Sequence, residues 1–245
     1  KKHIDAEIDD DVLQAVASAH ATGRRLYVAT SNVDTGRLTV WDMGGIASSG
    51  RPDAKDLYRK ILLATASVPG LLPPVELPVT INGKCFNELH VDGGATSMLF
   101  LRASELTADH QAVSAGRRPL AGSDAHVIVS AKLFKDPACV KKTTRKIGEA
   151  TLDSLLYSQA RGELLRIHSL CLLSGMRFRL TAIPEDEPTN VDSMKLSVAE
   201  MRRLYEVGYC QGVSGRAWRN DVPLGEPADH EPVRDGAELI LTPGR

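Results

Sequence analysis

The sequence predicts an α/β protein in which helices pack in layers on a β-sheet, an α/β/α arrangement. Strand-like and helix-like segments alternate over roughly 200 of the 245 residues, and no internal repeat occurs. Apolar residues make up 42% of the chain, enough for a sizeable core. We expect one domain over residues 1–220 and an exposed tail over 221–245, where Pro, Gly, Asp and Glu dominate. Reactive groups in such folds lie beyond the carboxyl ends of strands.

The first part of the chain contains two predicted helices and three predicted strands. Aspartates that suit an N-cap begin the first helix, and Gly23 suits its end. Two β-rich runs follow, joined by Asp-Thr-Gly, in which Gly36 suits the positive φ of a hairpin turn. Prolines beginning with Pro69 end the second helix. The predicted helices are 9–20 and 54–66, and the predicted strands are 25–33, 37–43 and 85–91.

The second part continues the alternation after a polar, arginine-containing loop over 107–124. The run "AHVIVSAK" is apolar enough to be a buried parallel strand. A long helical tract over 140–174 contains Gly148 and Gly162, so it forms either two helices or one helix with a bend. "MRFRLTAIP" has strand alternation, and the helix at 197–212 has a Ser197 and Glu200 capping box and a glycine stop.

Composition and charge argue against several classes of function. With 30 basic and 31 acidic residues the net charge is −1, so nucleic-acid binding is not expected. No dinucleotide-binding or phosphate-binding glycine motif occurs, which disfavours a nucleotide-binding protein. No metal or other cofactor is expected, and the cysteines, far apart and without CxxC spacing, are predicted to be free buried thiols. They are Cys85, Cys139, Cys171 and Cys210.

Three segments, taken together and in order, resemble a known family. They are "RLYVATSNVDTGRLTVWDMGGIA", "ILLATASVPGLLPPVEL" and "HVDGGATSMLF". At these separations they are similar to the second part of patatin-like phospholipases, with a similarity that covers roughly residues 25–212 and is strongest over 25–100. The resemblance implies a patatin-like α/β domain and a lipid acyl hydrolase, of phospholipase A or esterase type, that uses a Ser-Asp dyad.

The resemblance assigns a role to one short motif. "HVDGGATSMLF" matches the family's Asp-Gly-Gly motif, which implies that Asp92 is the acid of the dyad and that Gly93 and Gly94 shape its loop. In the family a serine hydroxyl attacks a lipid ester carbonyl and the aspartate acts directly as the base. The implied partners are a lipid or acyl-ester substrate and a peripheral contact with a membrane.

The chain departs from the family pattern at the nucleophile. Members carry a Gly-rich oxyanion loop and a Gly-x-Ser-x-Gly elbow before this region, and neither occurs here. "GGIASSG" is the nearest string, but Ser48 and Ser49 are not flanked as an elbow requires. We expect the chain to be the C-terminal two-thirds of such a domain, inactive by itself, with a preceding segment that carries the nucleophile. The alternative is a non-catalytic lipid- or protein-binding module, and the compartment stays open, a bacterial secreted or periplasmic location included.

Each candidate site residue also has a purely structural interpretation. Asp92 would cap a turn, because Asp bonds its own backbone and Gly accepts positive φ. His90 lies two residues earlier on the same strand and is expected in or beside the core rather than in a triad. His168 lies on a helix face with Leu164, Leu165 and Cys171, where a core or edge histidine is expected.

Three further groups have two interpretations. The aspartates at positions 9–11 are expected to cap a helix rather than bind a cation. A basic run is expected to be a solvated helix face rather than a lipid-headgroup contact; it comprises Lys141, Lys142, Arg145 and Lys146. The segment 71–74, Leu-Leu-Pro-Pro, suits an acyl-chain entrance and core packing equally.

Overall fold

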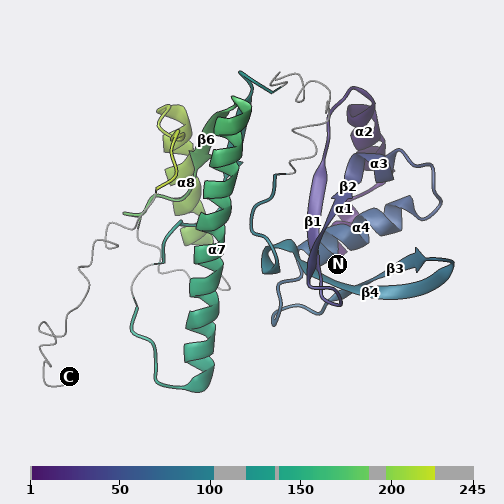
Figure 1. Cartoon of the computed structure of the whole chain (residues 1–245), viewed down its shortest axis with the longest axis horizontal. Helices are drawn as coiled ribbons and strands as arrows, with labels where there is room; N and C mark the ends of the chain where they lie inside the picture. The colour runs from purple at the N-terminus through teal and green to yellow at the C-terminus, as the bar shows by residue number, and fades with distance from the viewer. Residues whose placement is uncertain (1, 102–119, 136–137, 188–196, 224–245) are drawn as a thin grey trace, which may run out of the picture. The chain divides into compact units, whose positions relative to one another are not determined.

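The computed structural model describes residues 2–101, 120–135, 138–187 and 197–223 (Figure 1). It contains both helices and strands, so the predicted mixed α/β class is confirmed at that level. The chain divides into two compact units, one comprising Lys1–Phe100 with Ser158–Glu163, the other Leu101–Tyr157 with Leu164–Arg245. Each unit is described separately. The extent of the predicted domain, 1–220, stays a prediction.

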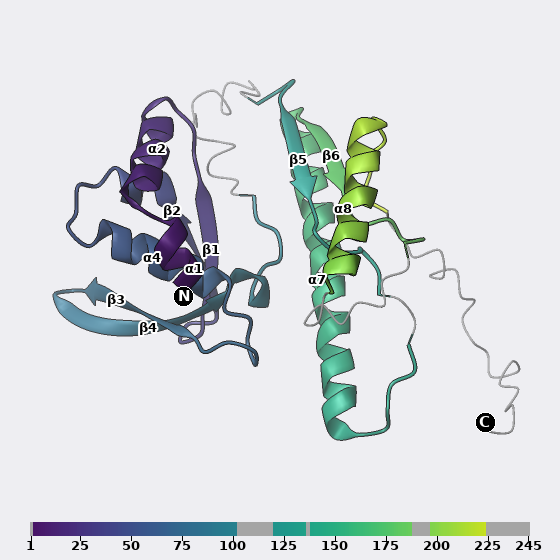
Figure 2. The ribbon, with the colours of Figure 1, turned by 180° about the vertical axis from the view of Figure 1, so that it is seen from behind.

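The first unit contains an antiparallel sheet of four strands. The strands are β1 (Tyr27–Asn32), β2 (Arg37–Asp42), β3 (Val75–Ile81) and β4 (Lys84–Asp92). They lie in the order β2-β1-β4-β3, and β3 with β4 forms a long curved hairpin (Figures 1 and 2). All three pairings are antiparallel, so the carboxyl ends of these strands do not share one edge, unlike the layered sheet we expected.

Helices cover one face of this sheet. They are α1 (Lys2–Glu7), α2 (Asp10–Ala21), α3 (Met43–Ala47) and α4 (Ala54–Thr65). α4 contacts β1, β3 and β4, and its buried Tyr58 and Ile61 form a core with Met43 and Leu77. The predicted helices 9–20 and 54–66 and the hairpin turn at Gly36, where φ is 65°, are confirmed. Hydrophobic spacing and turn residues were sufficient for these elements.

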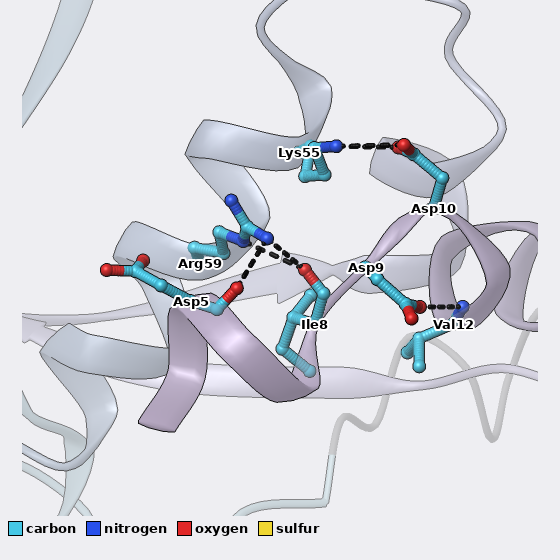
Figure 3. Close-up of polar contacts among 7 residues, drawn as sticks. All are labelled: Asp5, Ile8, Asp9, Asp10, Val12, Lys55 and Arg59. Atoms are coloured by element: carbon cyan, nitrogen blue, oxygen red, sulfur yellow. Dashed lines mark hydrogen bonds and ion pairs between the residues drawn. The ribbon is translucent and has the colours of Figure 1, made fainter. Parts of the chain in front are cut away.

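Polar contacts attach α1 to α4 (Figure 3). The Arg59 guanidinium donates hydrogen bonds to the backbone carbonyl of Asp5 at 2.8 Å and to that of Ile8 at 2.5 and 2.9 Å. Carbonyls at a helix C-terminus have no partner within the helix, so Arg59 supplies what the end of α1 lacks. Nearby, Lys55 forms an exposed ion pair with Asp10 at 2.8 Å.

Substitution of these two cations is expected to have unequal effects. Arg59→Ala should lower the free energy of unfolding by about 1–2 kcal/mol, because three charge-assisted hydrogen bonds to carbonyls are lost. Lys55→Ala, the matched control, should change it by less than about 0.5 kcal/mol, because an exposed ion pair contributes little. Urea unfolding of both variants measures the difference; equal effects would mean that Arg59 does not anchor α1.

The second unit contains a two-stranded parallel sheet and two helices. Its elements are β5 (Asp124–Ile128), α7 (Thr144–Ser174), β6 (Arg177–Thr181) and α8 (Val198–Val213). β5 pairs with β6, and the apolar side chains buried around this sheet include Leu164, Cys171, Phe178 and Leu180. Figures 1 and 2 show α7 running alongside the two strands. The predicted parallel pairing and both strands are confirmed.

Three expectations for this unit are corrected. The strand beginning at Asp124 is not buried, since Val127 is its one buried residue and Ile128 is 69% exposed. A two-stranded sheet leaves most side chains in contact with solvent. The tract over 140–174 forms a single helix of 31 residues that begins at Thr144. α8 has the predicted capping box but continues to Val213, so Gly212 is not its stop. Residues 107–119 and 224–245 of the predicted loop and tail lie outside the described residues.

An ion pair joins the first residues of β5 and β6. Arg177 donates to both carboxylate oxygens of Asp124, at 2.8 and 2.6 Å. The hydrogen bond to Arg177 lowers the pKa of Asp124 from 3.8 to about 2. Because the pKa is lower in the folded state, the stabilisation is complete above pH 4 and is lost as the pH falls toward 2.

This linkage gives a pH prediction. The difference in free energy of unfolding between the wild type and Asp124→Asn should be constant near neutral pH and should shrink as the pH falls from 4 to 2. Urea titrations at several pH values measure it. Glu149→Gln should show the same kind of dependence, because hydrogen bonds from Lys146 and Arg145 lower the pKa of Glu149 too. A difference that does not depend on pH would contradict the lowered pKa of Asp124.

Candidate functional site

Asp92 is the last residue of β4 and caps the single turn η1 (Gly93–Ala95) that follows. Its Oδ1 accepts a hydrogen bond from the Gly94 amide at 2.8 Å, and its own amide donates to the carbonyl of Ser67 at 3.0 Å. The side chain is half-buried, and within the described part of the chain Oδ2 accepts no hydrogen bond. The turn-capping interpretation is therefore confirmed, and one carboxylate oxygen is left for another partner.

Close packing explains the glycine that follows Asp92. Gly93 does not have a positive φ, contrary to the turn geometry we considered. A Cβ atom at this position would lie 2.7 Å from the carbonyl oxygen of Ala29 on β1. Ser31 also donates to the Gly93 carbonyl, at 3.2 Å. The glycine lets the loop after β4 lie directly against β1, which fixes the backbone beside Asp92.

The loop beyond η1 is held by the middle of α7, within the first unit. The Glu163 carboxylate accepts from the Ser97 hydroxyl at 2.5 Å and from the Leu99 amide at 2.7 Å. Gln159 donates to the carbonyl of Thr96 at 2.7 Å. None of these contacts was predicted from the sequence, because 63 to 66 residues separate the side chains from the loop.

His90 is fully buried and belongs to a hydrogen-bonded chain that crosses three strands. Thr30 Oγ1 lies 2.8 Å from His90 Nδ1 and accepts the indole N–H of Trp41 at 2.8 Å. His90 Nε2 lies 3.3 Å from the carboxylate of Glu88, which is 23% exposed. The Trp41 and His90 rings meet edge to face at 5.7 Å. His90 thus lies in the core, as predicted.

Both ring nitrogens of His90 already have partners inside the protein. Nδ1 lies against the Thr30 hydroxyl, and Nε2 lies against the Glu88 carboxylate. His90 has no nitrogen left to act as a base toward a substrate. This is why the structure favours a structural role over a triad role for His90.

No serine hydroxyl contacts Asp92 among the described residues. Ser97, the nearest serine along the chain, donates to Glu163 at 2.5 Å, and Ser67, whose carbonyl accepts the Asp92 amide, donates to the carbonyl of Leu63 at 2.8 Å. Ser48 and Ser49, the nearest match to an elbow, donate to carbonyls within α3. Ser31 donates to Gly93 as described above. The described residues therefore contain the predicted acid without a nucleophile.

Exposed apolar side chains occur on both segments that hydrogen-bond to Asp92. The segment after Ser67 presents Val68, Leu71 and Leu72, which are 41 to 50% exposed. Met98, 43% exposed, lies close to Gly94. Core packing, one of the two interpretations of segment 71–74, is therefore wrong for both leucines. An apolar surface beside a carboxylate suits an apolar substrate or membrane better than a charged ligand.

The other candidate residues have structural roles. Asp9 caps α2 through the Val12 amide at 2.9 Å, and no cluster of potential metal ligands occurs among the described residues. The basic run is exposed, as predicted, but only Arg145 and Lys146 lie on a helix, because Lys141 and Lys142 precede α7. His168 is half-buried, and its ring packs at a tilt against Phe178 with 4.9 Å between the ring centroids, as predicted for an edge histidine.

The prediction that the cysteines are free and buried is only partly right. All are free, but Cys171 alone is buried, and burial raises the pKa of its thiol. Cys85, Cys139 and Cys210 are exposed, because they lie on a hairpin end, a loop and a helix surface. None of the described helices is long and apolar enough to span a bilayer.

Comparisons with known proteins do not identify a family. No protein-family model matches the chain, and a search of curated proteins finds no match.

Proposed function

We propose that this chain is the acid-bearing part of a lipid acyl hydrolase of the patatin-like type. The observation that carries the proposal is the position of Asp92 at the end of β4, with one carboxylate oxygen unused and exposed apolar side chains beside it. The order and spacing of the three segments that resemble the family add support.

In this proposal the two carboxylate oxygens of Asp92 have different tasks. Oδ1 accepts the Gly94 amide and fixes the orientation of the carboxylate. Oδ2 accepts the proton of a serine hydroxyl as that hydroxyl attacks an ester carbonyl. A carboxylate is a weak base for a serine hydroxyl, so an oxyanion hole must supply much of the transition-state stabilisation. The serine and the oxyanion hole would come from a segment before Lys1.

The exposed apolar segment would receive the acyl part of the substrate. Val68, Leu71 and Leu72 follow Ser67, whose carbonyl accepts the Asp92 amide. Burial of apolar surface contributes about 25 cal/mol per Å², so an acyl chain seated on these side chains gains affinity without a charged partner. The proposal needs neither a metal nor another cofactor.

Fluorophosphonate labelling of the full-length gene product tests this proposal. The reagent modifies an activated serine, and mass spectrometry of the labelled peptide locates it. A labelled serine before Lys1, with labelling lost in Asp92→Asn, is the expected result. A well-folded full-length protein without any labelled serine would contradict the proposal.

One observation favours a second function, a binding module without catalysis. No serine hydroxyl contacts Asp92 in the ranges that the structure describes, and the sequence has no nucleophile elbow. Such a module would bind lipid through the same apolar segment but would not hydrolyse it. Binding of short-chain phospholipid that is retained in Asp92→Asn, without hydrolysis in either protein, would select this function.

A further inference from the structure

One side of α8 exposes a continuous row of apolar residues, here called the α8 stripe. Its members recur every three or four positions, which places them on one face of the helix. They are Val198 (63% exposed), Met201 (48%), Tyr205 (67%), Tyr209 (57%) and Val213 (73%). The rings of Tyr205 and Tyr209 stack on each other at 6.2 Å. The described part of the second unit places nothing over these side chains.

The opposite side of α8 is the side that faces its own unit. Leu204 and Val207 line a cavity of about 260 Å³ together with residues at the ends of β5 and β6, among them Ile128 and Ala182. The helix therefore has a packed side and an exposed apolar side. Five such residues in one row are more than the scattered apolar side chains usual on a surface.

The α8 stripe has nearly the same order of residue types when followed from either end of the helix. Valines lie at the two ends, and tyrosine lies at the centre. If two copies of α8 pack antiparallel about a two-fold axis between Tyr205 and Glu206, each Val198 meets the other copy's Val213. The same arrangement brings Met201 of one copy close to Tyr209 of the other. Such matching is what an isologous interface requires.

Two charges beside the stripe are complementary in the same arrangement. Arg202 and Glu206 lie one turn apart on one flank of the stripe, and neither forms an ion pair with any described residue. In an antiparallel pair each flank meets the same flank of the other copy, as in antiparallel coiled coils. Arg202 of one copy then lies within three residues, about 4.5 Å along the helix axis, of Glu206 of the other, which long side chains can span, twice per dimer.

We propose that the α8 stripe is an interface between two copies of this chain. A membrane is the less favoured partner, because α8 contains equal numbers of acidic and basic residues: Glu200, Arg202, Arg203 and Glu206. One pair of helices buries less surface than the roughly 800 Å² per partner that is typical of a stable interface. The dimer is therefore expected to be weak. This proposal does not depend on the proposed function.

Charge reversal at Arg202 and Glu206 tests the interface directly. Sedimentation equilibrium of the full chain should show a monomer–dimer equilibrium at micromolar concentrations. Arg202→Glu and Glu206→Arg should each weaken it by at least about tenfold, because like charges then face each other. The double variant should restore the wild-type constant, since both charges exchange places. Arg145→Glu on α7, at another exposed i,i+4 pair, is the control and should have no effect.

Several results would overturn the proposal. They are a wild-type chain that is monomeric at all concentrations, a dimer that the single reversals do not weaken, and a double variant that does not recover. Tyr205→Ser provides an independent variant, which should weaken the dimer and keep the circular dichroism spectrum of the wild type. Binding of the wild type to anionic vesicles that is lost in Tyr205→Ser, without self-association, would assign the stripe to a membrane instead.

Discussion

Asp92→Asn in the full-length gene product should reduce acyl-ester hydrolysis by about 10² to 10⁴-fold, the usual contribution of a general base. Its free energy of unfolding should stay within about 0.5 kcal/mol of the wild type, because the asparagine Oδ1 still accepts the Gly94 amide. Steady-state kinetics on a short-chain ester and urea unfolding of the same samples measure the two effects. Together they separate the catalytic role of the carboxylate from its capping role.

Asp92→Ala is the matched variant. It removes the acceptor for the Gly94 amide as well as the charge, so it should lose activity to the same extent and about 1 kcal/mol of stability in addition. Hydrolysis that persists in Asp92→Asn would exclude the dyad. Equal stability of the two variants would show that the cap contributes nothing.

His90→Ala should lower the free energy of unfolding by about 3 kcal/mol, the largest effect on stability that we expect. The ring is fully buried, so its removal leaves a cavity, and the Thr30 hydroxyl loses a hydrogen-bond partner. Thr30→Val keeps the shape but leaves both the Trp41 indole N–H and His90 Nδ1 without partners, at a cost of about 1–3 kcal/mol.

A double-mutant cycle shows whether the hydrogen-bonded side chains of Thr30 and His90 stabilise the fold together or independently. Because Thr30 and His90 share one hydrogen bond, their effects should be clearly less than additive in the double variant. Glu88→Gln is the control and should have little effect, since a glutamine side chain can still hydrogen-bond with His90 Nε2. Additive effects of Thr30→Val and His90→Ala would mean that the two side chains do not act together.

Local features of this fold were predictable from the sequence. The caps at Asp9 and at Ser197 with Glu200, and the turn at Gly36, are confirmed because each depends on residues within one turn of chain. Of the two alternatives for the tract that contains Gly148 and Gly162, the single helix is confirmed. A glycine costs about 1 kcal/mol in a helix, which a helix of 31 residues tolerates.

Long-range features could not be predicted in the same way. The antiparallel order of the first sheet depends on which strands meet, and hydrophobic patterns do not specify this. In the candidate site the sequence indicated Asp92 and its glycines but not Glu163 or the Thr30 hydroxyl. Their partners lie about 60 residues away along the chain, and neither residue belongs to a motif.

The contribution of Ser158–Glu163 to the first unit limits where the chain can be cut. A fragment that ends at Phe100 would contain the whole four-stranded sheet but would lack Glu163 and Gln159. The Leu99 amide would then lose its acceptor, and the Ser97 hydroxyl would keep only the carbonyl of Leu99, at 2.8 Å. The loop after Asp92 should therefore open more readily in such a fragment than in the whole chain. A piece meant to keep this loop closed has to include Ser158–Glu163.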